Sequence, residues 1–177
     1  MTDKTEFADI SILPRTLGLA DAEDERERRE LLVARCGARL IGVFADEAGQ
    51  VTAWKPLTPL PGAPQGVLGV VSLRGRISTV LDPLSLLGER RETEATTPFA
   101  FIITLRGDEQ LALAVERAER IIEIFTDDVE PLGSSSNSSV VRGLLQTEGA
   151  LVAVLNTREL FAAALLGTER RRKRGKE

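Results

Sequence analysis

Two polar side chains, Asp82 and Asn156, follow apolar runs at equivalent places in the two halves of the sequence. In a β protein with two similar halves, a pair of carboxylates can share one proton and act as acid and base. Here the second member is an amide, and neither residue lies in an Asp-Thr-Gly or Asp-Ser-Gly setting. A short side chain that caps a strand-to-helix turn is the favoured interpretation. A hydrolase that uses Asp82 is the alternative.

Other catalytic or metal-binding chemistry has little support. The chain contains no histidine, which removes the commonest general base and the usual Ser-His and Cys-His pairs. The single cysteine, Cys36, has Arg35 and Arg39 nearby, which can lower a thiol pKa, but an inert surface or semi-buried thiol is favoured. Asp127 and Asp128 are adjacent, yet calcium takes six or more oxygens, so a solvated turn is expected. We predict no catalytic residue, metal site or cofactor.

Composition narrows the class of protein. The 177 residues are 42% hydrophobic and carry a net charge of −4, which suits a folded interior and argues against a protein that binds nucleic acid phosphates. One cysteine fits a reducing cytoplasm. The longest apolar stretch near the end, 160–166, is far shorter than the roughly 20 residues that span a bilayer. A soluble, cytoplasmic protein is expected.

The two ends of the chain differ from the rest. Residues 1–29 include most of a mixed-charge run, 22–30, without an apolar stripe, so a flexible charged arm is predicted, with a docking arm as the alternative. Residues 168–177 are basic and are predicted to form a disordered, solubilising tail. Contact of this tail with an acidic partner or an anionic membrane is the alternative.

Short apolar runs separated by turn residues fill the region between the two ends. Many short strands at this spacing favour an all-β barrel or sandwich. Thr157–Leu166 contains strong helix formers with apolar residues at helical spacing, and predicts a helix that closes the fold. The predicted strands are 31–35, 40–45, 67–73, 77–81, 99–105, 110–115, 120–125, 140–145 and 151–155.

The two halves of this region resemble one another. A shift of 70 residues places Ile41 and Val43 on Leu111 and Leu113, and a shift of 74 places Val80 on Val154. The four additional residues belong naturally to the polar loop 133–139. The shared order of hairpin, turn, proline, strand, glycine turn and strand indicates a duplicated five-stranded unit. Because each half is small for a core of its own, the two units are expected to pack together.

The stretch 66–82, Gly-Val-Leu-Gly-Val-Val-Ser-Leu-Arg-Gly-Arg-Ile-Ser-Thr-Val-Leu-Asp, closely resembles the signature of the CheW family. Its most specific part is Leu73-Arg74-Gly75, read in this order and context. The resemblance covers about 31–167. Further matching segments are 44–48, 60–64, 115–124, 129–131 and 149–156.

This resemblance implies a fold of two small five-stranded, Src-homology-3-like β-barrels with an apolar groove between them and a C-terminal helix, formed by residues 30–167. It implies a non-enzymatic scaffold that couples the cytoplasmic tips of chemoreceptors to the regulatory domain of a CheA-type histidine kinase. Arg74 on its turn can offer a planar fork to a partner, whereas a local salt bridge supporting the turn is the alternative. The predicted partner-binding residues are Val70, Val71, Leu73, Arg74 and Gly75.

The sequence also departs from the family pattern. Thr79 stands where proline is common, Pro83 follows Asp82, Gln50 lies where a glutamate is usual, and Asn156 replaces an aspartate. A divergent adaptor of a pilus, gliding or other non-flagellar chemosensory pathway is therefore an alternative. A β-barrel that binds a small ligand or serves as a structural subunit is another, and a tight pocket with convergent polar groups would favour it.

Overall fold

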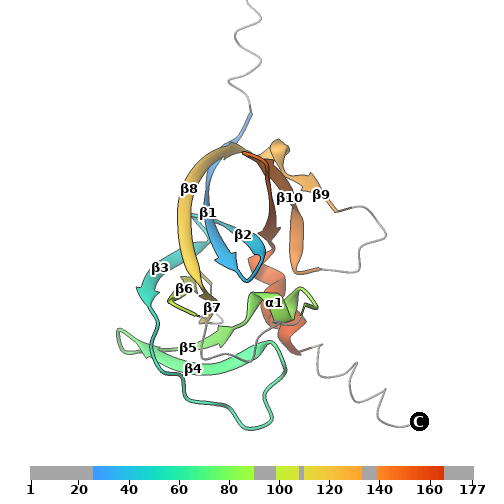
Figure 1. The fold of residues 1–177 in the computed structure, drawn as a ribbon. Helices are drawn as coiled ribbons and strands as arrows, with labels where there is room; N and C mark the ends of the chain where they lie inside the picture. The colour runs from blue at the N-terminus through green and yellow to red at the C-terminus, as the bar shows by residue number, and fades with distance from the viewer. Residues whose placement is uncertain (1–25, 90–98, 108–109, 133–138, 166–177) are drawn as a thin grey trace, which may run out of the picture.

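Two β-sheets form the body of the protein in the computed structural model, which describes residues 26–89, 99–107, 110–132 and 139–165. The upper sheet in Figure 1 has the strand order β8-β1-β2-β11-β10-β9, and the lower sheet has the order β3-β6-β7-β5-β4. The mostly-β expectation is confirmed. Both strand orders are open, so the hydrogen-bonded pairings do not show the expected closed barrels.

The strand boundaries agree closely with the apolar runs. The upper sheet consists of β1 (Arg28–Cys36), β2 (Arg39–Phe44), β8 (Arg117–Phe125), β9 (Glu130–Pro131), β10 (Val141–Thr147) and β11 (Ala150–Leu155). The lower sheet consists of β3 (Ala48–Ala53), β4 (Val67–Leu73), β5 (Arg76–Leu81), β6 (Phe101–Leu105) and β7 (Leu111–Val115).

Both sheets use the same pairing scheme. A hairpin, β4–β5 or β10–β11, joins the rest of its sheet through a parallel contact, β5 with β7 or β11 with β2. The parallel pair Thr79–Leu111 corresponds to Ala153–Ile41 under the shifts of 74 and 70 residues. Each hairpin also has an irregularity at the same place, after Val67 in β4 and after Val141 in β10.

The core consists of three clusters because many strands are buried on both faces. Residues such as Ile41 and Leu113 pack between the two sheets, and Leu160 and Ala164 of the C-terminal helix join them there. Alternate side chains along the same strands form a further cluster in each sheet. Phe44 and Val152 belong to the cluster of the upper sheet, and Ile102 and Val80 belong to that of the lower sheet.

Three parts of the fold were not predicted as they are, and one of them is the two-residue strand β9. The edge strand β3 was missed because Val51 is its single bulky apolar residue. The predicted helix starts as a 3-10 turn, η2 (Thr157–Glu159), and continues as an α-helix over 160–165, where the described segment ends. Two short elements complete the fold: α1 (Pro83–Leu86) and η1 (Thr126–Asp128).

The predicted ends of the chain fall mainly outside the described residues. Of the predicted arm, 1–25 is not described, and β1 starts at Arg28. The predicted tail, 168–177, and most of the polar loop 133–139 are not described either.

Candidate functional site

The turn between β4 and β5 carries the most specific motif of the sequence. Leu73 pairs with Arg76, which leaves Arg74 and Gly75 as the two turn residues. Their φ angles are 50° and 80°, and two positive φ values are the mark of a type I′ hairpin turn. Glycine tolerates this conformation, whereas a residue with a Cβ atom pays about 1 kcal/mol for it. The hairpin therefore fixes the backbone from which Arg74 extends.

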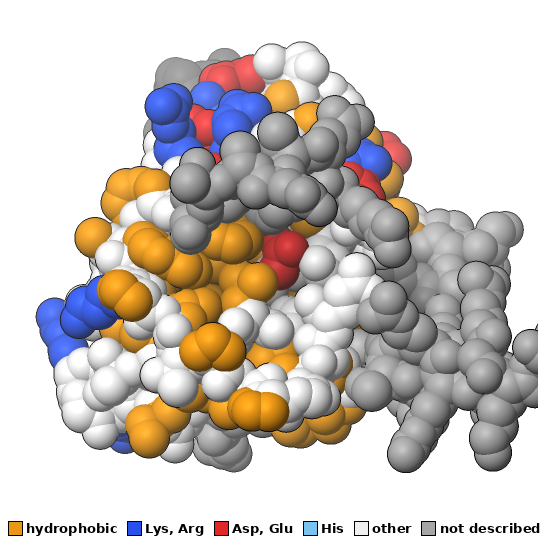
Figure 2. Space-filling model, turned by 60° about the horizontal axis from the view of Figure 1, so that its bottom comes forward, with side chains coloured by type: hydrophobic (Ala, Val, Ile, Leu, Met, Phe, Trp, Pro, Cys, Tyr) orange, Lys and Arg blue, Asp and Glu red, His pale blue; other side chains and the backbone are white. Residues whose placement is uncertain are grey.

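The alternation of side chains divides the predicted partner-binding residues between two faces of this hairpin. Val71 and Leu73 point into the interior of the lower sheet, and each is 6% exposed. Val70 lies on the opposite face, half-buried, where the cross-strand pairing also places Ile77, which is 65% exposed. Figure 2 shows the lower side of the molecule, where hydrophobic side chains gather over a broad area with basic side chains at its border.

Arg74 makes no ion pair with any other residue of the described segments. The equivalent residue of the upper sheet is Glu148, which has a similar φ of 44° and binds Arg120 with an N–O distance of 2.7 Å. The position that corresponds to Arg120 in the lower sheet is Gln50, which has no charge. The local salt bridge considered as an alternative role for Arg74 is thus absent from this part of the protein.

A hollow of about 460 Å³ adjoins this turn. Its lining includes Leu73, Arg74, Arg76, Gln50 and Arg106, with no aspartate or glutamate among the described lining residues. A second hollow of about 930 Å³ shares Arg106 and Gly107 with the first. Guanidinium groups around such a surface can bind carboxylates or carbonyl oxygens of a partner.

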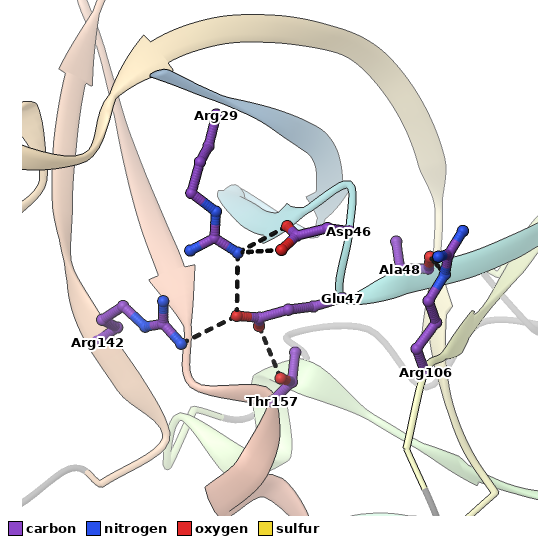
Figure 3. A network of polar contacts seen from close by, with 7 residues as sticks. All are labelled: Arg29, Asp46, Glu47, Ala48, Arg106, Arg142 and Thr157. Atoms are coloured by element: carbon purple, nitrogen blue, oxygen red, sulfur yellow. Dashed lines mark hydrogen bonds and ion pairs between the residues drawn. The ribbon is translucent and has the colours of Figure 1, made fainter. Parts of the chain in front are cut away.

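A polar network lies beside the second hollow, where the chain passes from the upper to the lower sheet. Glu47 accepts hydrogen bonds from Arg29, Arg142 and Thr157 at 3.4, 3.0 and 2.7 Å (Figure 3). Arg29 also donates to both oxygens of Asp46, which holds the pKa of that carboxyl below its ordinary value. Both side chains stabilise the junction through their contacts with Arg29 and Arg142.

The other residues with chemical potential have structural surroundings. Asp82 caps α1, as predicted, by accepting hydrogen bonds from the Leu84 amide at 3.2 Å and the Ser85 hydroxyl at 2.8 Å. Asn156 precedes η2, but its side chain makes no capping hydrogen bond, so the capping prediction is wrong there. The thiol of Cys36 is fully buried between the sheets rather than at the surface or half-buried, because its side chain faces the opposite sheet.

Asp127 and Asp128 form the short turn η1, as predicted, but Arg26 binds both carboxylates at 2.8 and 2.6 Å. The Arg26 hydrogen bond lowers the pKa of Asp127. No group of three or more candidate metal ligands occurs among the described residues. Within the same segments, no helix is long and apolar enough to cross a bilayer.

Sequence reasoning missed three residues of the surface around Arg74: Arg76, Ile77 and Arg106. The direction of Ile77 could have been predicted from the alternation of side chains along β5. Ser78 and Val80 lie an odd number of positions from Ile77, so that in a strand Ile77 points away from both. Arg106 belongs to a different hairpin, and only the packing of the strands brings it to the same hollow.

Comparisons with known proteins agree with this architecture. Residues 30–165 match the family model of the CheW-like domain. The chain is 29% identical to the Chemotaxis protein CheW of Rhizobium meliloti (strain 1021) over 136 residues, covering 75% of this chain and 87% of that protein. It is 28% identical to Protein FrzA of Myxococcus xanthus over 149 residues, covering 81% and 91%.

The fold is similar to that of the scaffolding protein TtCheW from Thermoanaerobacter tengcongensis. The TM-score is 0.67 at 21% sequence identity, over 76% of this chain and 88% of that chain. The family match covers most of the chain and includes both sheets and the hairpin that presents Arg74. This chain therefore belongs to the CheW-like domain family.

Proposed function

We propose that this protein is a non-enzymatic, cytoplasmic adaptor that couples chemoreceptors to a CheA-type histidine kinase in two-component chemosensory signalling. The observation that carries the proposal is Arg74, an exposed guanidinium on a conformationally fixed turn, with no ion pair in the described part of the chain. Relatives with the printed names chemotaxis protein CheW and FrzA support the same function.

The partner-binding residues are proposed to have two roles, one in direct contact with the partner and one in supporting the hairpin. Arg74 and Gly75 form the exposed turn, and Val70 contributes apolar area together with Ile77. Val71 and Leu73 are buried beneath them and hold the hairpin against the lower sheet. An exposed apolar area next to an arginine is a common composition for the centre of a protein interface.

We also propose that the two sheets derive from a duplicated, five-stranded, Src-homology-3-like barrel unit. Five strands of each sheet follow an equivalent order, with β9 as an additional strand of the upper sheet, and this order and the equivalent parallel pairs support this origin. The Arg120–Glu148 ion pair also supports this origin, because it joins the edge strand β8 to the β10–β11 turn on the other side of the upper sheet.

The proposal is tested with the full chain, a receptor cytoplasmic coiled-coil fragment and the regulatory domain of the kinase from the same source. Arg74→Ala is expected to weaken binding to at least one of them by about tenfold, since an interface arginine commonly contributes more than 1 kcal/mol. Its melting temperature should stay within about 2 °C of the wild type, because no described contact is lost. Isothermal titration calorimetry and differential scanning calorimetry measure the two quantities.

Arg117→Ala is the matched control, because Arg117 is also exposed and without an ion pair in the described segments but lies on β8, away from the turn. Absence of binding by the wild type to both partners would refute the adaptor function. A loss of stability in Arg74→Ala that accounts for the loss of binding would show that the arginine supports the turn.

A further inference from the structure

The chain passes from the upper to the lower sheet over residues 45–47, because β2 ends at Phe44 and β3 begins at Ala48. The first residue of this connection stays attached to the upper sheet, where the Ala45 amide donates a hydrogen bond to the Glu30 carbonyl at 2.8 Å. So short a connection keeps the two sheets close together at this point. It does not fix the angle between them, since each residue keeps two backbone torsions about which the sheets can rotate.

Glu47, the last residue of this connection, contacts both sheets. One carboxylate oxygen accepts hydrogen bonds from two arginines of the upper sheet, Arg29 of β1 at 3.4 Å and Arg142 of β10 at 3.0 Å (Figure 3). Its backbone carbonyl accepts a hydrogen bond at 2.8 Å from the amide of Arg106, which directly follows β6 of the lower sheet. The other carboxylate oxygen accepts the Thr157 hydroxyl at 2.7 Å, where the chain leaves β11 for the C-terminal helix.

The two arginines are held in place from their other side. The Arg29 guanidinium lies 3.6 Å from the centroid of the Phe44 ring, and the Arg142 guanidinium lies 5.1 Å from the same centroid. Phe44 is 1% exposed and belongs to the core of the upper sheet. Arg29 also donates hydrogen bonds to both oxygens of Asp46. The carboxylate of Glu47 therefore meets guanidinium groups whose positions are determined by the upper sheet.

The contacts of Glu47 are better shielded from water than another ion pair between the two sheets. The side chains of Glu47 and Arg29 are each 19% exposed, so that screening by solvent is limited. Arg39 of β2 and Glu89, which follows α1, are 55% and 37% exposed. Hydrogen bonds to a carboxylate depend on direction as well as distance, whereas apolar attraction is non-directional. Apolar packing therefore holds the sheets together, and the Glu47 contacts are suited to determine how they are oriented.

We infer that Glu47 acts as a joint that sets the angle between the two sheets. The duplication has not produced a second joint of this kind, because the shift of 70 residues places Glu47 on Arg117, a residue of opposite charge. The hairpin that carries Arg74 belongs to the lower sheet, so the joint also determines where this hairpin lies relative to the upper sheet. The joint is a property of the free chain and does not depend on the adaptor function.

The test compares the full chain with three variants: Glu47→Ala, Arg142→Met and the control Glu148→Ala. The control also removes a glutamate that binds an arginine, Arg120 at 2.7 Å, but this ion pair lies within the upper sheet. Residual dipolar couplings of the backbone amides, measured by nuclear magnetic resonance on weakly aligned protein, give the orientation of each sheet. Thermal unfolding checks that each variant is folded.

The wild type and Glu148→Ala are expected to have the same angle between the sheets. In Glu47→Ala, each sheet should keep its internal couplings, while the angle between the sheets should change by roughly 10°, the scale of a small rigid-body rotation. Arg142→Met removes one of the same hydrogen bonds and should give a smaller change in the same direction.

A wild-type angle in folded Glu47→Ala would overturn the joint, even with a lower melting temperature, because Glu47 would then stabilise the junction without orienting the sheets. An equal change of angle in Glu148→Ala would overturn it as well. If Glu47→Ala does not fold, Arg142→Met decides alone, and a wild-type angle in that variant refutes the joint.

Discussion

The state of a single side chain in this protein depends on its charged neighbours as much as on its packing. Asp46 is largely exposed, yet the pKa of its carboxyl is lowered because Arg29 donates hydrogen bonds to both oxygens at 2.6 and 2.7 Å. Arg74 has the opposite situation, with a fixed backbone and no ion pair within the described segments. The sequence indicated Arg74 through its motif, but only the distances between charged atoms show which side chains form ion pairs.

Removal of the Arg29 guanidinium should restore the titration of Asp46. In Arg29→Met, the carboxyl pKa is expected to rise toward its ordinary value of 3.8, measured by carbon-detected nuclear magnetic resonance titration. Because the folded pKa lies below the unfolded one, this contact stabilises the wild type above pH 4 to 5, and the stabilisation is lost as the pH falls through the folded pKa. The wild type should therefore lose stability more steeply with acid than the variant.

Asp127 provides the internal control for this titration. Its lowered pKa depends on Arg26, which Arg29→Met leaves in place. An Asp46 pKa that stays unchanged in Arg29→Met would show that the hydrogen bonds to Arg29 do not determine it.

The β4–β5 hairpin is the element on which the proposed function depends, and its shape is set by an irregularity as well as by its turn. Gly69 has a φ of 150°. It lies against the segment that contains Thr58, and Thr58 forms a β-bridge with Val70. A Cβ atom at Gly69 would be 2.5 Å from the Thr58 carbonyl oxygen. Gly143 of the equivalent hairpin is limited in the same way by the Glu130 carbonyl oxygen.

Gly69→Ala is therefore expected to lower the free energy of unfolding by about 2–4 kcal/mol, since both the backbone angle and the close approach are unfavourable. Gly62→Ala is the matched control: its φ is 73°, but nothing lies within 4 Å of the added Cβ. This control should lose only about 1 kcal/mol, from the backbone angle alone. Urea unfolding measures both, and equal losses would contradict the role of the contact with Thr58.

The whole molecule depends on the cluster between the two sheets. Leu113 of the lower sheet is fully buried there, in the same cluster as Ile41 of the upper sheet and Leu160 of the C-terminal helix. Each sheet alone would expose one apolar face of its central strands. The sheets are therefore expected to fold and unfold as one cooperative unit.

Leu113→Ala should lower the free energy of unfolding by about 2–5 kcal/mol, as for other fully buried leucines. Calorimetry should still show one transition, because neither sheet can retain its buried face without the other. Ile77→Ala, at a side chain that is 65% exposed, should cost less than about 0.5 kcal/mol. Two separate transitions in Leu113→Ala would show that the sheets are independent.

The sequence by itself determined the family, most of the strands and the turn that presents Arg74. These follow from local patterns, since alternation, glycine turns and a motif depend on residues near one another in the chain. The capping role of Asp82 was predictable for the same reason. The edge strand β3 was not, because an edge position does not require a run of large apolar residues.

Only the tertiary structure decided which faces are buried and which charges are paired. Val71 and Leu73 point inward while Val70 points outward, although all three belong to the same apolar strand. Arg106 lines the same hollow as Arg74 and Arg76, although it belongs to a different hairpin. Ion pairs such as Arg120–Glu148 join a strand to a turn that is remote in the chain. Such contacts depend on distances between segments remote in the chain, which local patterns do not encode.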